Sequence, residues 1–503
     1  MNSDVGNRHS LPASGLKSAD AVAPQSVLVV VPAAIVDRDS TQLMASCLIN
    51  LLARQVGTIS RIAIECGSTA RRIPFPCPTA YADLAAALVE LGRWTTAGRV
   101  PVDLVDANHV SDIVLHVGQK EAVSSAAHEL ICIGSGWRGW VGSPSNAPPA
   151  AVADDANPLG PFMAASLAAG EVFKRARGIA RGRMLDAAGV SLWTGDSGAD
   201  WDALADGPTI ADCSLPPLHV VGAGAVGQAL AYVFRYAEAA SYLAVIDDDR
   251  HDDTNLNRCF LAGDGDLEQP KVDAVKRFEG DRLKVRAFDR DLAGYLTDPR
   301  ADLDPRLAER ADRCEFQFLV SCVDRGYARQ QLQSLWPEVI FGGSTIGLVA
   351  LSDTYRRGSG GACLACHNPA EKEAERIWSL RKRLGGMDAA DLNAFLVAEG
   401  VDPGAVVEEL ARPRCGSDGA AALTQLARQP PEFSAGFVSL AAGVLLASNL
   451  LRDLVFAQTA PKRLCRIALS FLNGEIDQAD LAIDPNCEQR CGSRAEDAQV
   501  AHE

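Results

Sequence analysis

With 503 residues, 48% of them hydrophobic, the chain is long enough for about two to four domains, each with its own core. Its formal net charge of −16 argues against nucleic acid as the main ligand, because neutralising phosphates requires a basic surface. No apolar run reaches the roughly 18 residues that a membrane-spanning helix requires, so no membrane association is expected.

The first third of the chain is typical of a doubly wound α/β domain. Residues 1–25 are polar and rich in Ala and Ser, and are expected to be disordered. After them we predict strands at 26–31, 61–65, 112–117 and 129–133, and helices at 41–55 and 164–176. The turn after the first strand is Pro32-Ala33-Ala34-Ile35, where a nucleotide-binding domain of this class has glycines. This domain is therefore predicted to lack a phosphate loop.

A glycine-rich turn follows the strand predicted at 218–221. Gly222, Gly224 and Gly227 form a G-x-G-x-x-G pattern, and a helix is predicted directly after it. Glycines permit a tight turn and a close backbone approach, and free N–H groups at the helix N-terminus bind an anion. The next predicted strand, 242–246, ends in Asp247, which is placed to accept hydrogen bonds from ribose hydroxyls. An NAD-binding dehydrogenase would fit these features equally well.

The charged groups after this turn favour a triphosphate. Arg258 and Lys271 supply cations thirteen positions apart, and Asp324 follows a buried strand predicted at 317–322. An ATP attacked at its α-phosphorus needs cations at the β- and γ-phosphates, where charge accumulates as pyrophosphate leaves. A carboxylate at the C-terminal edge of a parallel sheet is a suitable Mg²⁺ ligand. Taken singly, Arg258 and Lys271 could be ordinary surface charges, and Asp247 could be a helix cap. Their order along one chain favours an ATP site.

This stretch resembles the ThiF/MoeB-type adenylyltransferases and the ubiquitin-activating enzymes that share their fold. The family pattern D-x-D-x-V-x-x-S-N-L-x-R-Q, then Q-P-K, then C-x-D-N, corresponds here to residues 247–259, 269–271 and 322–325. Departures from the pattern are His251, Thr254, Cys259 and Arg325. They lie at the periphery of the expected site, so they affect fine positioning more than the phosphate contacts.

The resemblance implies ATP and Mg²⁺ as cofactors and assigns the residues around them. Asp247 is expected on the ribose, Arg258 and Lys271 on the phosphates and in catalysis, and Asp324 on the metal. The full set of implied nucleotide-site residues is Gly222, Gly224, Gly227, Asp247, Asp249, Asn255, Arg258, Lys271 and Asp324.

Cysteine spacing predicts a metal site. The chain has 14 cysteines and no secretory signal, so a cytoplasmic location is expected, where metal binding or catalysis is a commoner use of cysteine than disulfides. Cys363 and Cys366 form one pair, and Cys487 and Cys491 form a second, wider pair near the C-terminus. Two such pairs can close one tetrahedral, structural Zn²⁺ site, with four free cysteines as the alternative. The resembled family carries paired C-x-x-C motifs in these two places.

Residues 367–431 are predicted to form a helical insertion. Its expected helices lie at 370–383, 388–397 and 404–411. Cys415 follows, directly before another helix, with Arg412 and Arg414 beside it. A helix N-terminus and nearby cations favour the thiolate, so Cys415 is a candidate nucleophile, although an incidental half-buried cysteine is the alternative. In ubiquitin-activating enzymes a cysteine of such an insertion receives the activated carrier as a thioester, and the resemblance implies this role for Cys415.

An internal echo suggests that the fold is duplicated. Residues 167–172 (LAAGEV) resemble residues 440–445 (LAAGVL), where small side chains allow close helix packing. The simplest interpretation is two copies of one α/β fold, the first without its phosphate loop; an unrelated α/β domain is the alternative. Ubiquitin-activating enzymes pair an inactive and an active adenylation half in this way, whereas ThiF and MoeB proteins pair two identical chains. No arginine of the first half is identified as the ATP contact that an inactive half usually contributes.

The expected fold class is therefore α/β, with two doubly wound Rossmann-like adenylation domains forming a pseudo-dimer within one chain. Several such chains could also associate into a higher oligomer. The expected segments are a disordered N-terminus (1–25), an inactive adenylation-like domain (26–185), an active adenylation domain (186–366, completed by 432–491), the cysteine-bearing insertion (367–431) and a disordered tail (492–503).

The resemblance implies a ubiquitin-like protein-activating enzyme. It would activate the C-terminal glycine of a ubiquitin-like protein as an acyl-adenylate, form a thioester on Cys415 and pass the carrier to a conjugating enzyme. The alternative within the same chemistry is a sulfur-carrier or peptide adenylyltransferase without a thioester step. A regulatory subunit that binds nucleotide without turnover and an NAD-dependent oxidoreductase are two alternatives from other classes.

Overall fold

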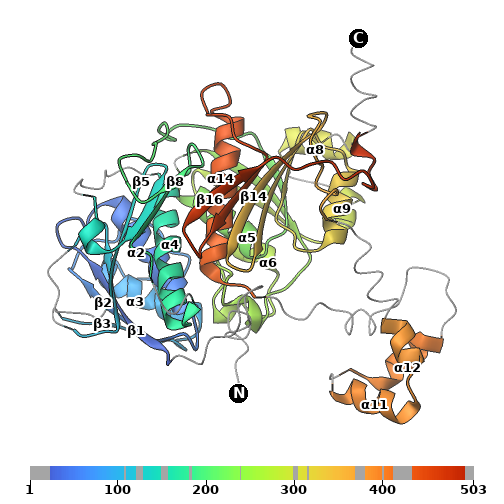
Figure 1. Cartoon of the computed structure of the whole chain (residues 1–503), viewed down its shortest axis with the longest axis horizontal. Helices are drawn as coiled ribbons and strands as arrows, with labels where there is room; N and C mark the ends of the chain where they lie inside the picture. Colours follow the sequence, from blue (N-terminus) through green and yellow to red (C-terminus); the bar gives the residue numbers. More distant parts are fainter. Residues whose placement is uncertain are drawn as a thin grey trace.

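The structure is a computed structural model that describes residues 23–106, 109–120, 128–148, 157–179, 184–237, 239–297, 304–313, 316–368, 380–398, 401–411 and 433–492. It has two α/β halves side by side, each built on an eight-stranded sheet (Figure 1). The N-terminal segment 1–22 and the segment with Cys415 lie outside the described residues.

The first half carries strands rich in Val and Ile, which suit a sheet buried on both faces. Its elements are β1 (Gln25–Val31), α2 (Asp39–Ala53), β2 (Ile59–Cys66), α3 (Leu84–Thr95), β3 (Val102–Leu104), β4 (Ile113–Val117), β5 (His128–Ser135), β6 (Arg138–Gly142), α4 (Leu159–Ala176), β7 (Ala187–Ser191) and β8 (Ser197–Gly198). The predicted strands and helices of this half are confirmed within a few residues. Its sheet continues to Gly198, past residue 185, where the first domain was expected to end.

The second half repeats the order of the strands and of the helices α2, α3 and α4, with added helices before and after β12. Its core elements are β9 (Leu218–Val221), α5 (Ala225–Tyr236), β10 (Ser241–Asp247), α6 (Lys271–Arg277), β11 (Leu283–Asp289), β12 (Phe318–Ser321), α9 (Gly326–Ser334), β13 (Val339–Ile346), β14 (Val349–Arg356), α14 (Gly436–Leu454), β15 (Arg466–Ser470) and β16 (Glu475–Ala479). Short helices α7 (Leu292–Thr297) and α8 (Pro305–Arg313) connect β11 to β12.

The two sheets have the same topology. Their strand orders are β3-β2-β1-β4-β5-β6-β7-β8 and β11-β10-β9-β12-β13-β14-β15-β16. In each sheet the first five strands are parallel and the last three are antiparallel. An unrelated first domain would not be expected to repeat an eight-strand order, so the structure favours the duplicated fold over that alternative.

The turn after β1 differs from its counterpart after β9. Ile35 is only 3% exposed, and a Cβ added to Gly118 at the end of β4 would lie 2.6 Å from its Cδ1 atom. The place beside the β1 turn is therefore filled by an aliphatic side chain. That the first half lacks a phosphate loop stays a prediction.

Helices α4 and α14 occupy equivalent positions and pack against each other between the sheets (Figure 1). A Cβ at Gly443 would lie 2.5 Å from the Cβ of Ala229 on α5, so the glycine of the LAAG echo permits close helix packing. By length and composition α14 could span a membrane, which corrects the expectation that no segment is apolar enough. However, 89% of its apolar window is buried inside the protein.

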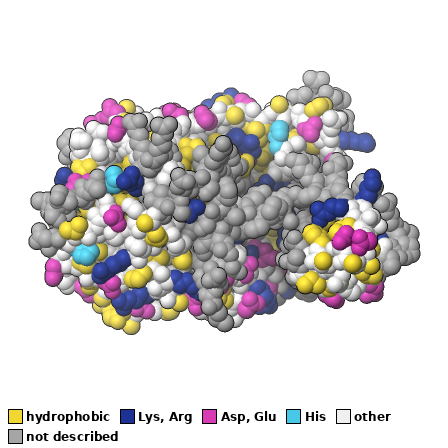
Figure 2. All heavy atoms as spheres, turned by 60° about the horizontal axis from the view of Figure 1, so that its bottom comes forward, with side chains coloured by type: hydrophobic (Ala, Val, Ile, Leu, Met, Phe, Trp, Pro, Cys, Tyr) yellow, Lys and Arg dark blue, Asp and Glu magenta, His cyan; other side chains and the backbone are white. Residues whose placement is uncertain are grey.

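The insertion forms a small separate unit. Helices α11 (Ala389–Ala398) and α12 (Pro403–Ala411) share a cluster of buried side chains, including Leu396 and Val406. Figure 1 shows this unit in orange, apart from the two halves. In Figure 2 its surface, at the right, has hydrophobic side chains among charged ones, and Val397 and Val407 are 63% and 52% exposed.

His116 on β4 gives the fold a testable pH dependence. Its ring is fully buried, neither ring nitrogen has a hydrogen-bond partner, and burial lowers its pKa to about 4. Below pH 6.5 the unfolded chain binds a proton that the folded chain resists, so stability falls as the pH drops towards 4. Lowering the pH from 7 to 5 should cost about 2 kcal/mol through this group.

Between pH 7 and pH 5 we therefore expect the free energy of unfolding of His116→Leu to fall by about 2 kcal/mol less than that of the unmodified chain. Urea unfolding followed by tryptophan fluorescence would measure it, since five of the seven tryptophans lie before residue 202. Equal pH slopes in the two proteins would contradict the prediction.

Candidate nucleotide site

The glycine turn after β9 has a geometry that requires glycine at two positions. Gly222 has φ +103°, and a Cβ there would lie 2.6 Å from the carbonyl oxygen of Cys322. A Cβ on Gly227 would lie 2.0 Å from the carbonyl oxygen of Gly222. In contrast, a Cβ on Gly224, the N-cap of α5, would meet nothing within 4 Å. The turn is therefore open at Gly224, next to the N-terminus of α5. The free N–H groups of this helix end favour the binding of an anion.

Asp247 ties the end of β10 to this turn. Its carboxylate accepts hydrogen bonds from the backbone N–H of Ala223 (2.5 Å) and of Asp249 (2.8 Å). Burial raises the pKa of Asp247, although Lys271 and the two N–H donors act in the opposite direction. Its predicted contact with a ribose is compatible with this position and stays a prediction.

Lys271 begins α6 and reaches back to the β10 end. Its Nζ forms an ion pair with Asp249 Oδ2 at 2.8 Å, and its side chain is 13% exposed. Burial alone would lower the pKa of Lys271, but Asp247 and Asp249 outweigh it and raise the pKa overall. The amine therefore stays charged at neutral pH, and a phosphate would have to compete with Asp249 for it.

Arg258 and Asn255 lie on the loop 252–262 between β10 and α6, which contains one 3-10 turn at Asp253–Asn255. The Arg258 guanidinium is half-buried and donates to the carbonyl of Thr254 and to Asn257 Oδ1 (2.8 Å). Asn255 is buried, and its Nδ2 donates to Asp252 Oδ1 at 2.5 Å. Both side chains contact their own loop, so engaging phosphates would require a change of side-chain partners.

Asp324 is exposed and lies just past β12, between that strand and α9. Arg329 on α9 fixes the segment, since its Nε donates to the carbonyl of Val323 at 3.0 Å. The same guanidinium contacts Asn368, which follows the Cys363–Cys366 turn. Asp324 thus lies at the same sheet edge as the glycine turn, where a metal bound with the nucleotide would have a carboxylate available.

A buried network behind the turn was not anticipated from the sequence. Gln228 Nε2 donates to the carbonyl of Ala223 (3.1 Å) and to Nε2 of His251 (2.8 Å), so this histidine nitrogen is the acceptor. Burial lowers the pKa of His251 to about 4, which keeps the ring neutral. Gln228 also accepts from the N–H of Leu261. The only sequence signal was that His251 departs from the family pattern.

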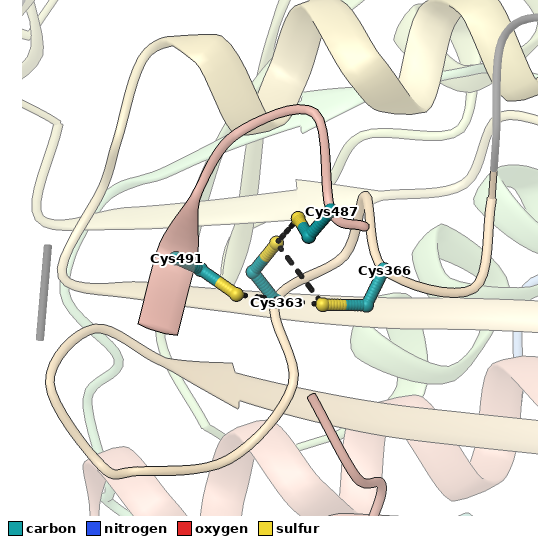
Figure 3. A group of neighbouring side chains, drawn as sticks. All are labelled: Cys363, Cys366, Cys487 and Cys491. Atoms are coloured by element: carbon teal, nitrogen blue, oxygen red, sulfur yellow. Dashed lines mark hydrogen bonds between the residues drawn. The ribbon is translucent and has the colours of Figure 1, made fainter. Parts of the chain in front are cut away.

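The four cysteines of the two predicted pairs come together at one point (Figure 3). Their Sγ–Sγ distances are 3.7 Å (Cys363–Cys366), 3.6 Å (Cys363–Cys487) and 3.4 Å (Cys366–Cys491). A disulfide needs about 2.05 Å, whereas four thiolates about 2.3 Å from one Zn²⁺ lie about 3.8 Å apart. All four are buried. The arrangement fits a tetrahedral metal better than disulfides.

Comparison with known proteins identifies the second half. Residues 217–464 match the ThiF family, and they span the glycine turn, Lys271, Asp324 and α14. The second half of the chain belongs to the ThiF family. This is an adenylyltransferase-type enzyme family, and the ATP-site residues predicted from the sequence lie within its matched region. Residues 26–192 match a second family, the BilD N-terminal domain.

Individual relatives of this ThiF-family chain include the bacterial E1-like protein BilD of Collimonas sp. (strain OK412). It is 27% identical over 403 residues, which cover 73% of this chain and 78% of the relative. Similar solved structures include E. coli MccB with succinimide (12% identity, TM-score 0.33) and with ATP (13% identity, TM-score 0.33). Each alignment covers 56% of this chain and 67% of the MccB chain.

Proposed function

We propose that this chain adenylates the C-terminal carboxylate of a ubiquitin-like protein. The observation that carries the proposal is the arrangement at one edge of the second sheet. There an open glycine turn, the Lys271 cation and the Asp324 carboxylate lie together on a ThiF-family domain. The E1-like relative supports a protein, and not a free small acid, as the second substrate.

The proposed first step is a nucleophilic displacement at the α-phosphorus of ATP. A carboxylate oxygen of the terminal glycine attacks the α-phosphorus of ATP, the bond to the bridging oxygen breaks, and pyrophosphate leaves. Lys271 and Arg258 would neutralise the charge that develops on the leaving group, while N–H groups at the α5 N-terminus hold the nucleotide. Mg²⁺, when bound with ATP, would supply further positive charge, and Asp324 would hold it.

In the proposed second step Cys415 takes the carrier. Its thiolate attacks the carbonyl carbon of the acyl-adenylate, AMP leaves, and a thioester forms. A cysteine of a conjugating enzyme then attacks the thioester and releases Cys415 as thiolate. The described part of the insertion supports this step in one respect: it is a separate helical unit with exposed apolar side chains, suited to contact a protein.

The first half would serve as the inactive partner of a pseudo-dimer. Its sheet repeats the topology of the second half, but Ile35 fills the place beside the β1 turn. One chain would then supply both halves of an assembly that needs a single active site.

Formation of a labelled adenylate tests the proposal. Purified chain is incubated with α-³²P-ATP, Mg²⁺ and a ubiquitin-like protein that ends in glycine, with pyrophosphatase present. We expect labelled acyl-adenylate with the intact carrier and none when its last glycine is deleted. Labelling of a short peptide with a free C-terminal carboxylate, but of no ubiquitin-like protein, would instead favour the peptide adenylyltransferase. Tight NAD binding without ATP use would refute both.

We further propose that Cys363, Cys366, Cys487 and Cys491 bind one structural Zn²⁺. The ion would join the segment after β14 to the C-terminal segment, two parts of the chain more than 120 positions apart.

Removal of one thiolate should therefore release the metal. We expect Cys366→Ser to lose bound zinc, measured by mass spectrometry of the metal content, and to make residues after 480 sensitive to protease. Cys465→Ser is the matched control, because this nearby thiol lies outside the cluster and accepts from the N–H of Leu481. Equal zinc content in the two variants would contradict the prediction.

A further inference from the structure

Arg54, the C-cap of α2 in the first half, is fully buried against the second half. Its Nη1 donates to the carbonyl of Leu256 (2.7 Å), and its Nη2 donates to the carbonyls of Phe260 (3.3 Å) and Ala262 (2.9 Å). Its Nε donates to Asn50 Oδ1 at 2.7 Å. All four partners are neutral oxygens, and three of them belong to the loop 252–262 of the other half.

A buried charge is costly, so this one must be well compensated. The guanidinium lies near the rings of Trp94 and Phe260, at 6.0 and 5.9 Å from their centroids, which adds cation–π stabilisation. Asn50 Nδ2 also donates to the carbonyl of Phe260, at 3.3 Å. The site is therefore complete without an external anion, and Arg54 does not face a phosphate.

The loop that Arg54 holds carries Asn255 and Arg258. Its backbone is irregular, so the carbonyls at 256, 260 and 262 depend on side-chain donors. A second connection between the halves supports the same loop region: Arg99 of the first half pairs with Asp264 at 2.7 Å. This loop is thus held by side chains of the first half as well as by Gln228 of its own half.

We propose that Arg54 is a positioning residue for the ATP site, through which the first half holds the backbone of the loop that carries Arg258, so that only side chains have to change partners to reach a phosphate. This deepens the proposed function and rests on it. It also gives the first half a role that needs no nucleotide of its own. The sequence offers no local signal for it, because the donor and its acceptors are more than 200 positions apart.

The test compares Arg54→Met with Arg463→Met in the full chain. Arg463 is the control, since it is a half-buried arginine that also donates across the halves, to the carbonyl of Leu192, and among the described residues it makes no hydrogen bond to the loop. Hydrogen exchange of a peptide covering 252–262 reports on the loop directly. Titration with Mg·ATP reports on the site and requires no carrier protein.

We expect Arg54→Met to exchange faster in this peptide and to bind Mg·ATP roughly tenfold to a hundredfold more weakly. Arg463→Met should change neither. Unchanged loop exchange in Arg54→Met, or an equal increase in both variants, would overturn the proposal. If Arg54→Met does not fold, Arg54→Lys and Asn50→Ala replace it, because each removes only part of the network. Each of them must then show faster exchange of 252–262 and weaker Mg·ATP binding than Arg463→Met. If the unmodified chain ignores Mg·ATP, the proposed function fails, and loop exchange still decides whether Arg54 holds the loop.

Discussion

Replacing Lys271 with alanine should abolish ATP-dependent adenylate formation while leaving the fold intact. Lys271 Nζ lies 2.8 Å from Asp249, with Asp247 nearby. Without the Lys271 amine, the carboxylates of Asp247 and Asp249 would repel the triphosphate. The start of α6, beside the glycine turn, would also lose its positive charge. Loss of one preorganised donor at a developing charge typically costs a factor of about 10² to 10³ in rate. We expect at least that loss, measured with α-³²P-ATP and a ubiquitin-like protein that ends in glycine.

Lys276→Ala is the control for this experiment. Lys276 lies on the same helix, and its Nζ also pairs with a carboxylate, that of Glu279, at 2.7 Å. It contacts the carbonyl of Val285, away from the glycine turn. Adenylation by this variant should match the unmodified chain. If both variants kept full adenylation, Lys271 would not contact the triphosphate and the assignment of the site would be wrong.

Local chemistry made part of this site predictable from the sequence. The glycines of the turn were identifiable because two of them occupy positions where any Cβ would meet a backbone oxygen. The cysteine pairs were identifiable because metal ligation leaves a spacing pattern, although their meeting in space had to be assumed. The central parallel strands β1, β2, β4, β5, β9, β10 and β12 followed from apolar runs, and the LAAG echo pointed correctly to two helices that pack together.

What the sequence did not reveal depends on distant contacts. Arg54 is an unremarkable arginine at a helix end until its acceptors in the other half are seen. Gln228 and His251 form their bond across a turn that no periodicity describes. The antiparallel strands β6, β7 and β14 to β16 were missed because their pairing is set by the topology of the whole sheet. The sequence also did not show that the Arg258 side chain folds onto its own loop.

Cys415→Ala should separate the two proposed steps. The variant is expected to form the acyl-adenylate at the rate of the unmodified chain, because the proposed nucleotide site lies on the second half and Cys415 lies in the predicted insertion. It should form no thioester, since the thiol proposed to accept the carrier has been removed. The readout is a carrier adduct on a non-reducing gel that a reducing agent cleaves, measured beside adenylate formation in the same samples.

Cys213→Ala is the control, because Cys213 is a half-buried thiol outside the insertion, and burial and Asp212 raise its pKa. That variant should keep both steps. A reducible carrier adduct that persists in Cys415→Ala would assign the thioester to another cysteine while leaving the adenylation step untouched. Absence of any adduct in the unmodified chain, together with normal adenylate formation, would instead mean that the chain stops at the adenylate, as a sulfur-carrier or peptide adenylyltransferase does. Because the two steps use different residues on different parts of the fold, each outcome identifies which part of the proposal fails.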